Sequence, residues 1–136
     1  MTPEQVELVT KSFDAIRHRD LARSFYSRFF ELVPDARPLF PSDMERQHLK
    51  LMDSIAAIVG ALDESELFQS IISNTGRRHA YVGATPSHFV AFREALIWGL
   101  EQQFGPEFTP ELRRAWVELY DAVQSEMMRA AKIRVD

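Results

Sequence analysis

Histidine is the side chain here best suited to bind a metal or to carry a proton near neutral pH. The four histidines are His18, His48, His79 and His88. None stands four residues from another, so the zinc motif with two histidines on one helical face is absent. His79 follows two arginines and shortly precedes Gly83. Taken alone, a single histidine at the end of a helix is typical of a surface or capping residue.

Two hydrogen-bond donors in the first half of the chain could act on a small ligand. Tyr26 lies in an aromatic cluster, the segment 25–30, and Gln47 begins a segment that continues with Lys50 and Leu51. A phenol hydroxyl and a primary amide can each donate to an electron-rich atom. Considered separately, the sequence predicts that Tyr26 is a core aromatic residue and that Gln47 is exposed to solvent.

Composition limits the classes of protein. The 136 residues suit one domain, 1–136, and a hydrophobic fraction of 46% is enough for a core. The net charge is −4, with acidic and basic residues mixed, which argues against a nucleic-acid partner. The absence of cysteine excludes disulfides, cysteine zinc sites, iron–sulfur clusters and thioether-linked cofactors.

Membrane insertion and secretion are not indicated by the sequence. The longest apolar run, 55–59, is far shorter than the about 20 residues that cross a bilayer. The first 14 residues carry acidic side chains and lack the pattern of a signal peptide. We therefore expect a cytoplasmic protein without a membrane segment.

The elements that must position these side chains are helices. Threonine precedes proline at Thr2, Thr85 and Thr109, which predicts three helix starts, because threonine caps helices and proline is tolerated at the first helical position. Apolar residues recur every three or four positions, and no segment alternates as a strand would. The expected helices are 3–18, 20–33, 35–40, 44–61, 64–80, 86–104 and 110–131, with a break at Arg19–Asp20. The fold class is thus all-α, with six to seven helices.

Four separated segments resemble the globin family. They are 25–40 with Phe40 at a corner, 47–52, 76–83 ending in Val82 and Gly83, and 104–120. The likeness is to single-domain bacterial globins, to neuroglobin and to the haem domain of flavohaemoglobins. It implies a globin fold of crossed helices around non-covalent haem b.

The resemblance also implies roles for individual residues. His79 would be the ligand to the iron, and Tyr26 and Gln47 would donate to the gas, on which dioxygen carries partial negative charge. Lys50 would meet a haem propionate. The other residues expected to line the haem pocket are Phe29, Phe40, Leu51, Ile55, Val82, Phe89, Phe92, Leu96 and Val123.

Departures from the family pattern refine this expectation. Neuroglobin has histidine where Gln47 stands, and glutamine is a poor iron ligand, so the sixth position should be open or hold water. His48 is one residue further on, about 100° around the helix, and should face away from the iron. Flavohaemoglobins place a tyrosine and a glutamate beside the proximal histidine, and here Phe89 and Ala131 fall at those positions.

Several functions agree with these residues. The first is reversible binding of dioxygen, or of carbon monoxide or nitric oxide, for storage, transport or scavenging. The second is a nitric oxide dioxygenase served by a separate reductase, and the third is a haem-based gas sensor. A globin fold that has lost haem is a fourth reading. The sequence leaves enzymatic activity open, and it is compatible with a monomer or a homodimer.

Overall fold

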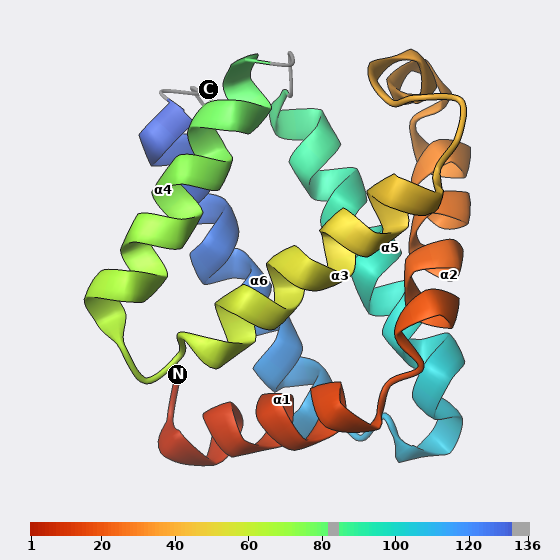
Figure 1. The fold of residues 1–136 in the computed structure, drawn as a ribbon. Helices are drawn as coiled ribbons and strands as arrows, with labels where there is room; N and C mark the ends of the chain where they lie inside the picture. The colour runs from red at the N-terminus through yellow and green to blue at the C-terminus, as the bar shows by residue number, and fades with distance from the viewer. Residues whose placement is uncertain (82–84, 132–136) are drawn as a thin grey trace.

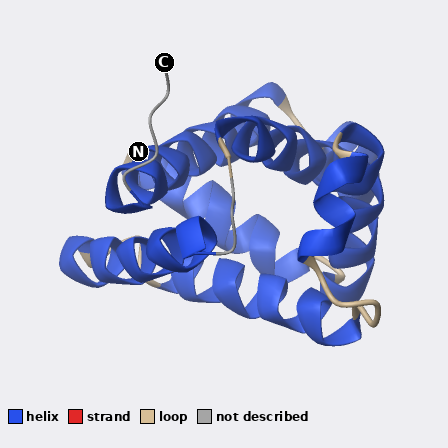
Figure 2. Cartoon of the chain, turned by 90° about the horizontal axis from the view of Figure 1, so that it is seen from above, coloured by secondary structure: helices blue, strands red, loops and turns tan. Residues whose placement is uncertain are grey.

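The chain folds as a set of helices joined by short connections (Figures 1 and 2). This computed structural model describes residues 1–81 and 85–131, with only the backbone for 79–81 and 131. No β-strand occurs in the described part, which confirms the all-α prediction. The α-helices are α1 (Pro3–Ala15), α2 (His18–Leu32), α3 (Glu45–Gly60), α4 (Ser65–Tyr81), α5 (Pro86–Phe104) and α6 (Pro110–Ala131). The 3₁₀ helices are η1 (Pro34–Leu39) and η2 (Gly105–Glu107).

All three predicted Thr-Pro starts are helix N-termini. The Thr2 hydroxyl accepts from the Gln5 backbone N–H at 3.1 Å, and the Gln5 side chain accepts from the Thr2 backbone N–H at 2.9 Å. Thr85 forms the same reciprocal arrangement with His88, whose ring Nδ1 accepts from the Thr85 backbone N–H at 3.1 Å. The Thr109 hydroxyl accepts from the Leu112 backbone N–H at 3.2 Å. These bonds satisfy donors that a helix start leaves without an internal partner.

One predicted boundary was wrong, and one predicted helix is of the 3₁₀ type. The first break falls at Ile16 and Arg17, so that α1 ends at Ala15 and α2 begins at His18, ahead of the expected break at Arg19–Asp20. Ile16 has extended dihedrals (φ −75°, ψ 141°) and is buried, which places its side chain in the core instead of continuing the helix. The expected helix 35–40 is the 3₁₀ helix η1, whose interior Pro38 has no N–H for an α-helical bond.

The helices pack as crossed pairs around a shared core (Figure 1). The most extensive packing joins α4 to α6 and α2 to α5. Each of these pairs meets at a glycine: a Cβ on Gly76 would lie 2.5 Å from the Met127 carbonyl oxygen, and one on Gly99 would lie 2.9 Å from Leu21 Cδ1. Buried Trp116 joins α6 to α1, since its Nε1 donates to the Ser12 hydroxyl at 2.9 Å.

We expect Gly76→Ala to lower the free energy of unfolding by about 1–3 kcal/mol, the usual cost of overpacking a close contact. The added methyl group would meet the backbone of Met127, which cannot rotate away as a side chain can. Urea denaturation followed by circular dichroism measures the change. Gly60→Ala is the control, because nothing lies within 4 Å of its added Cβ, and it should not destabilise the protein. Equal stability of the two variants would contradict the close-contact explanation.

Candidate functional site

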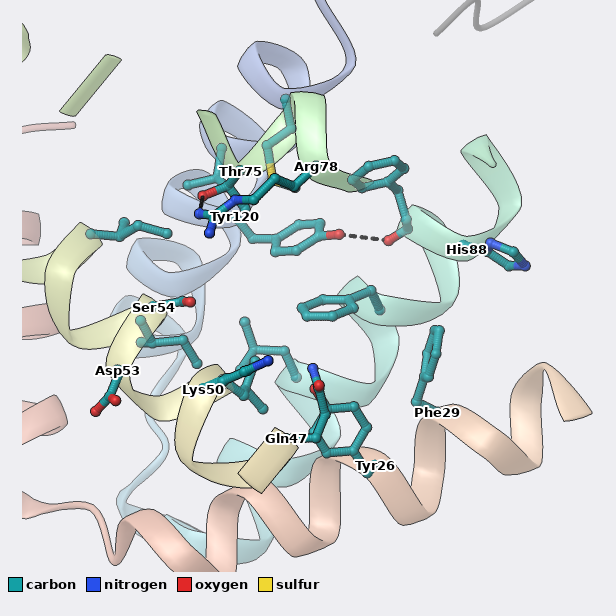
Figure 3. A pocket seen from close by; sticks show the side chains of 18 of the residues that line it. Tyr26, Phe29, Gln47, Lys50, Asp53, Ser54, Thr75, Arg78, His88 and Tyr120 are labelled. Carbon is teal, nitrogen blue, oxygen red and sulfur yellow. Dashed lines mark hydrogen bonds between the residues drawn. The ribbon is translucent and has the colours of Figure 1, made fainter. Parts of the chain in front are cut away.

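A cavity of about 570 Å³ lies inside the helical shell (Figure 3). Helices α2 and α3 and the corner after η1 form one part of its wall, and α4, α5 and α6 form the other. Most of its lining is apolar and aromatic. A cavity of this size and character is typical of a small-molecule or cofactor site.

Two hydrogen-bonded polar side chains stand in one wall of this cavity. Gln47 Nε2 on α3 donates to the Tyr26 hydroxyl oxygen on α2 at 3.1 Å. Tyr26 is only 4% exposed, and Gln47 is half-buried. Because the phenol oxygen accepts this bond, the phenol proton is available to a ligand in the cavity. Figure 3 shows both side chains at the edge of the cavity opposite Thr75 and Arg78.

His48 lies beside this pair, and it does not line the cavity. Its ring stacks on the Tyr26 ring with centroids 5.3 Å apart and planes 16° from parallel. Burial lowers the pKa of His48, Arg23 lowers it further, and Glu45 acts in the opposite direction. Of these two neighbouring residues of α3, only Gln47 lines the cavity.

Burial raises the pKa of Tyr26 to about 12, while its bond to Gln47 acts in the opposite direction. The phenol should therefore remain a donor throughout the physiological range and beyond.

We expect the Tyr26 phenolate to form only near pH 12 in the folded protein, measured as the ultraviolet difference between wild type and Tyr26→Phe. Because the folded pKa lies above the unfolded value of about 10, Tyr26 stabilises the fold fully below pH 10 and loses this contribution up to pH 12. The loss should be about 2–3 kcal/mol. A phenolate signal at pH 10 in folded protein would rule out this environment.

The corner after η1 places Phe40 against the donor pair. The Phe40 ring meets Tyr26 edge-on at 5.6 Å between centroids, and it meets Phe30 at 5.4 Å and Phe29 at 6.3 Å in the same manner. Edge-to-face contacts of this kind favour one relative orientation of the rings. Phe40 therefore limits how the Tyr26 ring can tilt.

The α4 side of the cavity includes Thr75 and Arg78 (Figure 3). His79 follows Arg78 in α4, and its side chain lies outside the described residues, as does the whole of Val82. Arg78 and Lys50 line the cavity and both residues are exposed, and Arg78 Nη2 donates to the Thr75 hydroxyl at 3.5 Å. Two cations in the lining are suited to an anionic ligand group.

Tyr120 on α6 is a second buried phenol in the wall. Its hydroxyl donates to the Phe89 backbone carbonyl at 2.7 Å, the bond dashed in Figure 3. Burial raises the pKa of Tyr120, Asp121 raises it further, and Arg93 acts in the opposite direction. Because the Tyr120 hydroxyl proton is donated to Phe89, it is not available to a ligand in the cavity, and the bond links α6 to α5.

The structure brings most of the predicted site residues together. The predicted residues that line the cavity are Tyr26, Phe29, Phe40, Gln47, Lys50, Leu51, Ile55, Phe89, Phe92, Leu96 and Val123. Sequence reasoning missed further lining residues, which are Ala36, Leu39, Asp53, Ser54, Ile58, Thr75, Arg78, His88, Trp116, Leu119, Tyr120 and Met127. A three-residue step from Ile55 to Ile58, or a four-residue step from Val123 to Met127, could have identified some of them.

Comparison with known proteins identifies the architecture. The sequence model of the globin family matches residues 23–127, which include every residue that lines the cavity. The chain belongs to the globin family.

This globin is similar to vertebrate neuroglobins in sequence. It is 29% identical to neuroglobin of Tetraodon nigroviridis over 95% of this chain and 91% of that protein. With neuroglobin of Danio rerio the identity is 32%, over 76% of this chain and 74% of that protein.

Solved structures have the same fold. A hexacoordinated haem protein from an anhydrobiotic tardigrade superposes with a TM-score of 0.87 at 16% identity, covering 97% of this chain and 96% of that one. An engineered carbene transferase, a putative nitric oxide dioxygenase from Rhodothermus marinus, gives 0.85 at 26% identity, covering 97% and 94%. A bacterial globin from Campylobacter jejuni gives 0.84 at 18% identity, covering 96% of each chain.

Family membership implies haem-based gas binding for this globin. Within the described residues, no helix combines the length and the apolar character required to span a bilayer.

Proposed function

We propose that this globin holds haem b in the 570 Å³ cavity and reversibly binds dioxygen there, with Tyr26 as the donor to the gas and Gln47 holding the Tyr26 hydroxyl. The observation that carries the proposal is the 3.1 Å bond from Gln47 to the phenol oxygen in a mostly apolar wall. It leaves the phenol proton for a ligand that lies in the cavity.

The residues around the cavity fit a flat, largely apolar cofactor with carboxylate groups. Aromatic and aliphatic side chains from α2, α3, α5 and α6 form a mostly apolar enclosure. Lys50 and Arg78 are exposed residues of the lining and could pair with propionates. The chain has no cysteine, so the cofactor would be held without a thioether bond.

We assign His79 as the residue that would hold the iron. Haem iron bound through one imidazole supplies a coordination position for a diatomic gas. His79 lies in α4, immediately after Arg78 and one helical turn after Thr75, both of which line the cavity. The α4 side of the cavity stands opposite Tyr26 and Gln47 (Figure 3). This arrangement supports a protein ligand on one side and hydrogen-bond donors on the other.

Three features of the chain's own residues would act on the gas. The Tyr26 hydroxyl would donate to its outer atom, Gln47 would hold that hydroxyl through its amide, and Phe40 would restrict the ring. A hydrogen bond to a partly charged acceptor contributes about 1.5–3 kcal/mol, so release of dioxygen should be slow. The surrounding apolar side chains would exclude water.

Nitric oxide dioxygenation is the second candidate function. The similarity to a putative nitric oxide dioxygenase at 26% identity and nearly full coverage favours it. In this reaction dioxygen, nitric oxide and one electron combine to give nitrate, so a separate reductase must supply the electron. The same donor pair would hold the dioxygen for attack by nitric oxide.

Absorption spectra of the purified, haem-supplied protein test the main proposal. We expect stoichiometric haem uptake and distinct, interconvertible spectra for the reduced protein with and without dioxygen. Adding nitric oxide, a flavin reductase and a nicotinamide reductant distinguishes the two candidate functions. Nitric oxide dioxygenation predicts that nitrate forms over many cycles, whereas a protein that only binds dioxygen should not sustain this turnover. A protein that stays colourless with excess haem would refute both.

A further inference from the structure

Arg37 makes an unusual set of bonds at the corner between η1 and α3. Its Nη1 donates to the carbonyl oxygens of Phe40 at 3.3 Å and Pro41 at 2.9 Å, and its Nη2 donates to that of Ser42 at 3.1 Å. One planar guanidinium therefore holds three successive backbone carbonyls. A side chain with five N–H donors in a rigid fork can do this, and a lysine ammonium lacks that planar fork.

Pro41 and Ser42 are exposed, so without Arg37 their carbonyl oxygens would bond only to water and the corner would lose these links. Residues 41–44 are not helical, so the corner lacks the regular bonds that a helix would provide. Among the described residues, none of the ion pairs includes Arg37. The guanidinium also lies over the Phe30 ring, 5.3 Å from its centroid, which ties the corner to α2.

The corner lies between the two polar side chains of the site: it contacts Tyr26 through Phe40, and it leads into the helix that carries Gln47. Phe40 projects from it into the cavity wall and packs edge-on against Tyr26. At its other end Met44 occupies the N-cap position of α3 without a side-chain capping bond, and its carbonyl accepts from the His48 backbone N–H at 2.8 Å, next to Gln47. The conformation of 40–44 therefore influences both the tilt of Tyr26 and the start of the helix that carries Gln47.

We propose that Arg37 is a positioning residue for the gas site: by bonding the carbonyls of 40–42 it fixes Phe40 and the start of α3, and so fixes the geometry of the Tyr26–Gln47 pair. The inference rests on the proposed gas-binding function for its effect on ligands. The fixing of the corner itself does not depend on haem.

Two substitutions of Arg37 and one control separate positioning from general stability. Arg37→Met keeps a long stem over Phe30 and removes all side-chain donors, whereas Arg37→Lys keeps the positive charge with its donors on a single nitrogen. The control is Arg28→Met, since Arg28 also lies over an aromatic ring, Trp98 at 5.7 Å, and bonds to Glu31 at 3.1 Å. Arg28 makes none of the corner bonds.

The first measurement is amide hydrogen exchange at the two ends of the corner in haem-free protein: at the Phe40 N–H, which donates to the Arg37 carbonyl, and at the His48 N–H, which donates to the Met44 carbonyl. Losing the carbonyl bonds in Arg37→Met should speed exchange at the corner by about tenfold or more, with a smaller change in Arg37→Lys. Arg28→Met should match the wild type there. Unchanged corner exchange in Arg37→Met, even with a lower melting temperature, would overturn the proposal.

The second measurement is the infrared band of carbon monoxide taken up by haem-loaded protein, together with the release rate of dioxygen. We expect a broadened or split band and a several-fold faster release in Arg37→Met, and wild-type behaviour in Arg28→Met. A single unchanged band, or equal changes in both variants, would also overturn the proposal. If wild type takes up no haem, the proposed function and the effect on ligands fail together, while the exchange result still decides whether Arg37 fixes the corner.

Discussion

Replacing His79 with alanine should leave a folded protein that loses haem at least about 100-fold faster than the wild type. Loss of an outer partner of a metal ligand typically costs 10–100-fold in affinity, and removal of the ligand itself should cost more. Haem transfer to an acceptor globin, followed by absorption, measures the rate. Imidazole added to the buffer should partly restore the wild-type spectrum by filling the position of the lost side chain.

His48→Ala and His88→Ala are the matched controls for this experiment. The His48 ring packs on Tyr26, and the His88 ring caps α5, so neither is expected to hold iron. Both variants should keep haem with the wild-type spectrum. If His48→Ala changes the reduced spectrum and His79→Ala does not, our assignment of the iron ligand is wrong.

The second large effect is expected for Tyr26→Phe, which should release dioxygen about 10- to 100-fold faster. The substitution removes one hydrogen bond to a partly charged acceptor, worth about 1.5–3 kcal/mol, and leaves the packed ring in place. Stopped-flow displacement of dioxygen by carbon monoxide gives the rate. Gln47→Leu should speed dioxygen release less in the Tyr26→Phe background than in the wild type, because Gln47 acts through the phenol oxygen that Tyr26→Phe removes.

Tyr120→Phe is the control for a buried phenol in the same cavity. Its hydroxyl proton is already bonded to the Phe89 carbonyl, so dioxygen release should stay within twofold of wild type. Its loss should instead lower the free energy of unfolding by about 0.5–1.5 kcal/mol. If Tyr26→Phe and Tyr120→Phe changed release equally, donation by Tyr26 would not be the cause.

The helices could be predicted because their signals are local. A threonine before a proline marks a start within two residues, and an apolar stripe is visible over a few turns. The end of α1 was not predictable in this way, because Ile16 leaves the helix to reach a core built by distant segments. Likewise, the sequence did not indicate that His88 would occupy the capping position usually filled by glutamate or glutamine.

The candidate site was only partly predictable for the same reason. Helical geometry alone separates Gln47 from His48 by about 100°, and the structure has only the former in the cavity lining. The bond from Tyr120 to Phe89 joins residues 31 positions apart, and no local pattern indicates it. Arg37 contacts the nearby corner, yet a surface arginine and one that holds three carbonyls have the same local sequence signal.

The close approach of α4 to α6 at Gly76 determines where motion within the molecule would spread. α4 packs mainly on α6, with a smaller contact to α3, and Gly76 lies directly against the Met127 backbone. A displacement of α4 caused by a change at bound haem would therefore be transmitted to the second half of α6 more directly than to α2. Chemical shifts near Met127 should consequently change on oxidation or ligation more than those of α2.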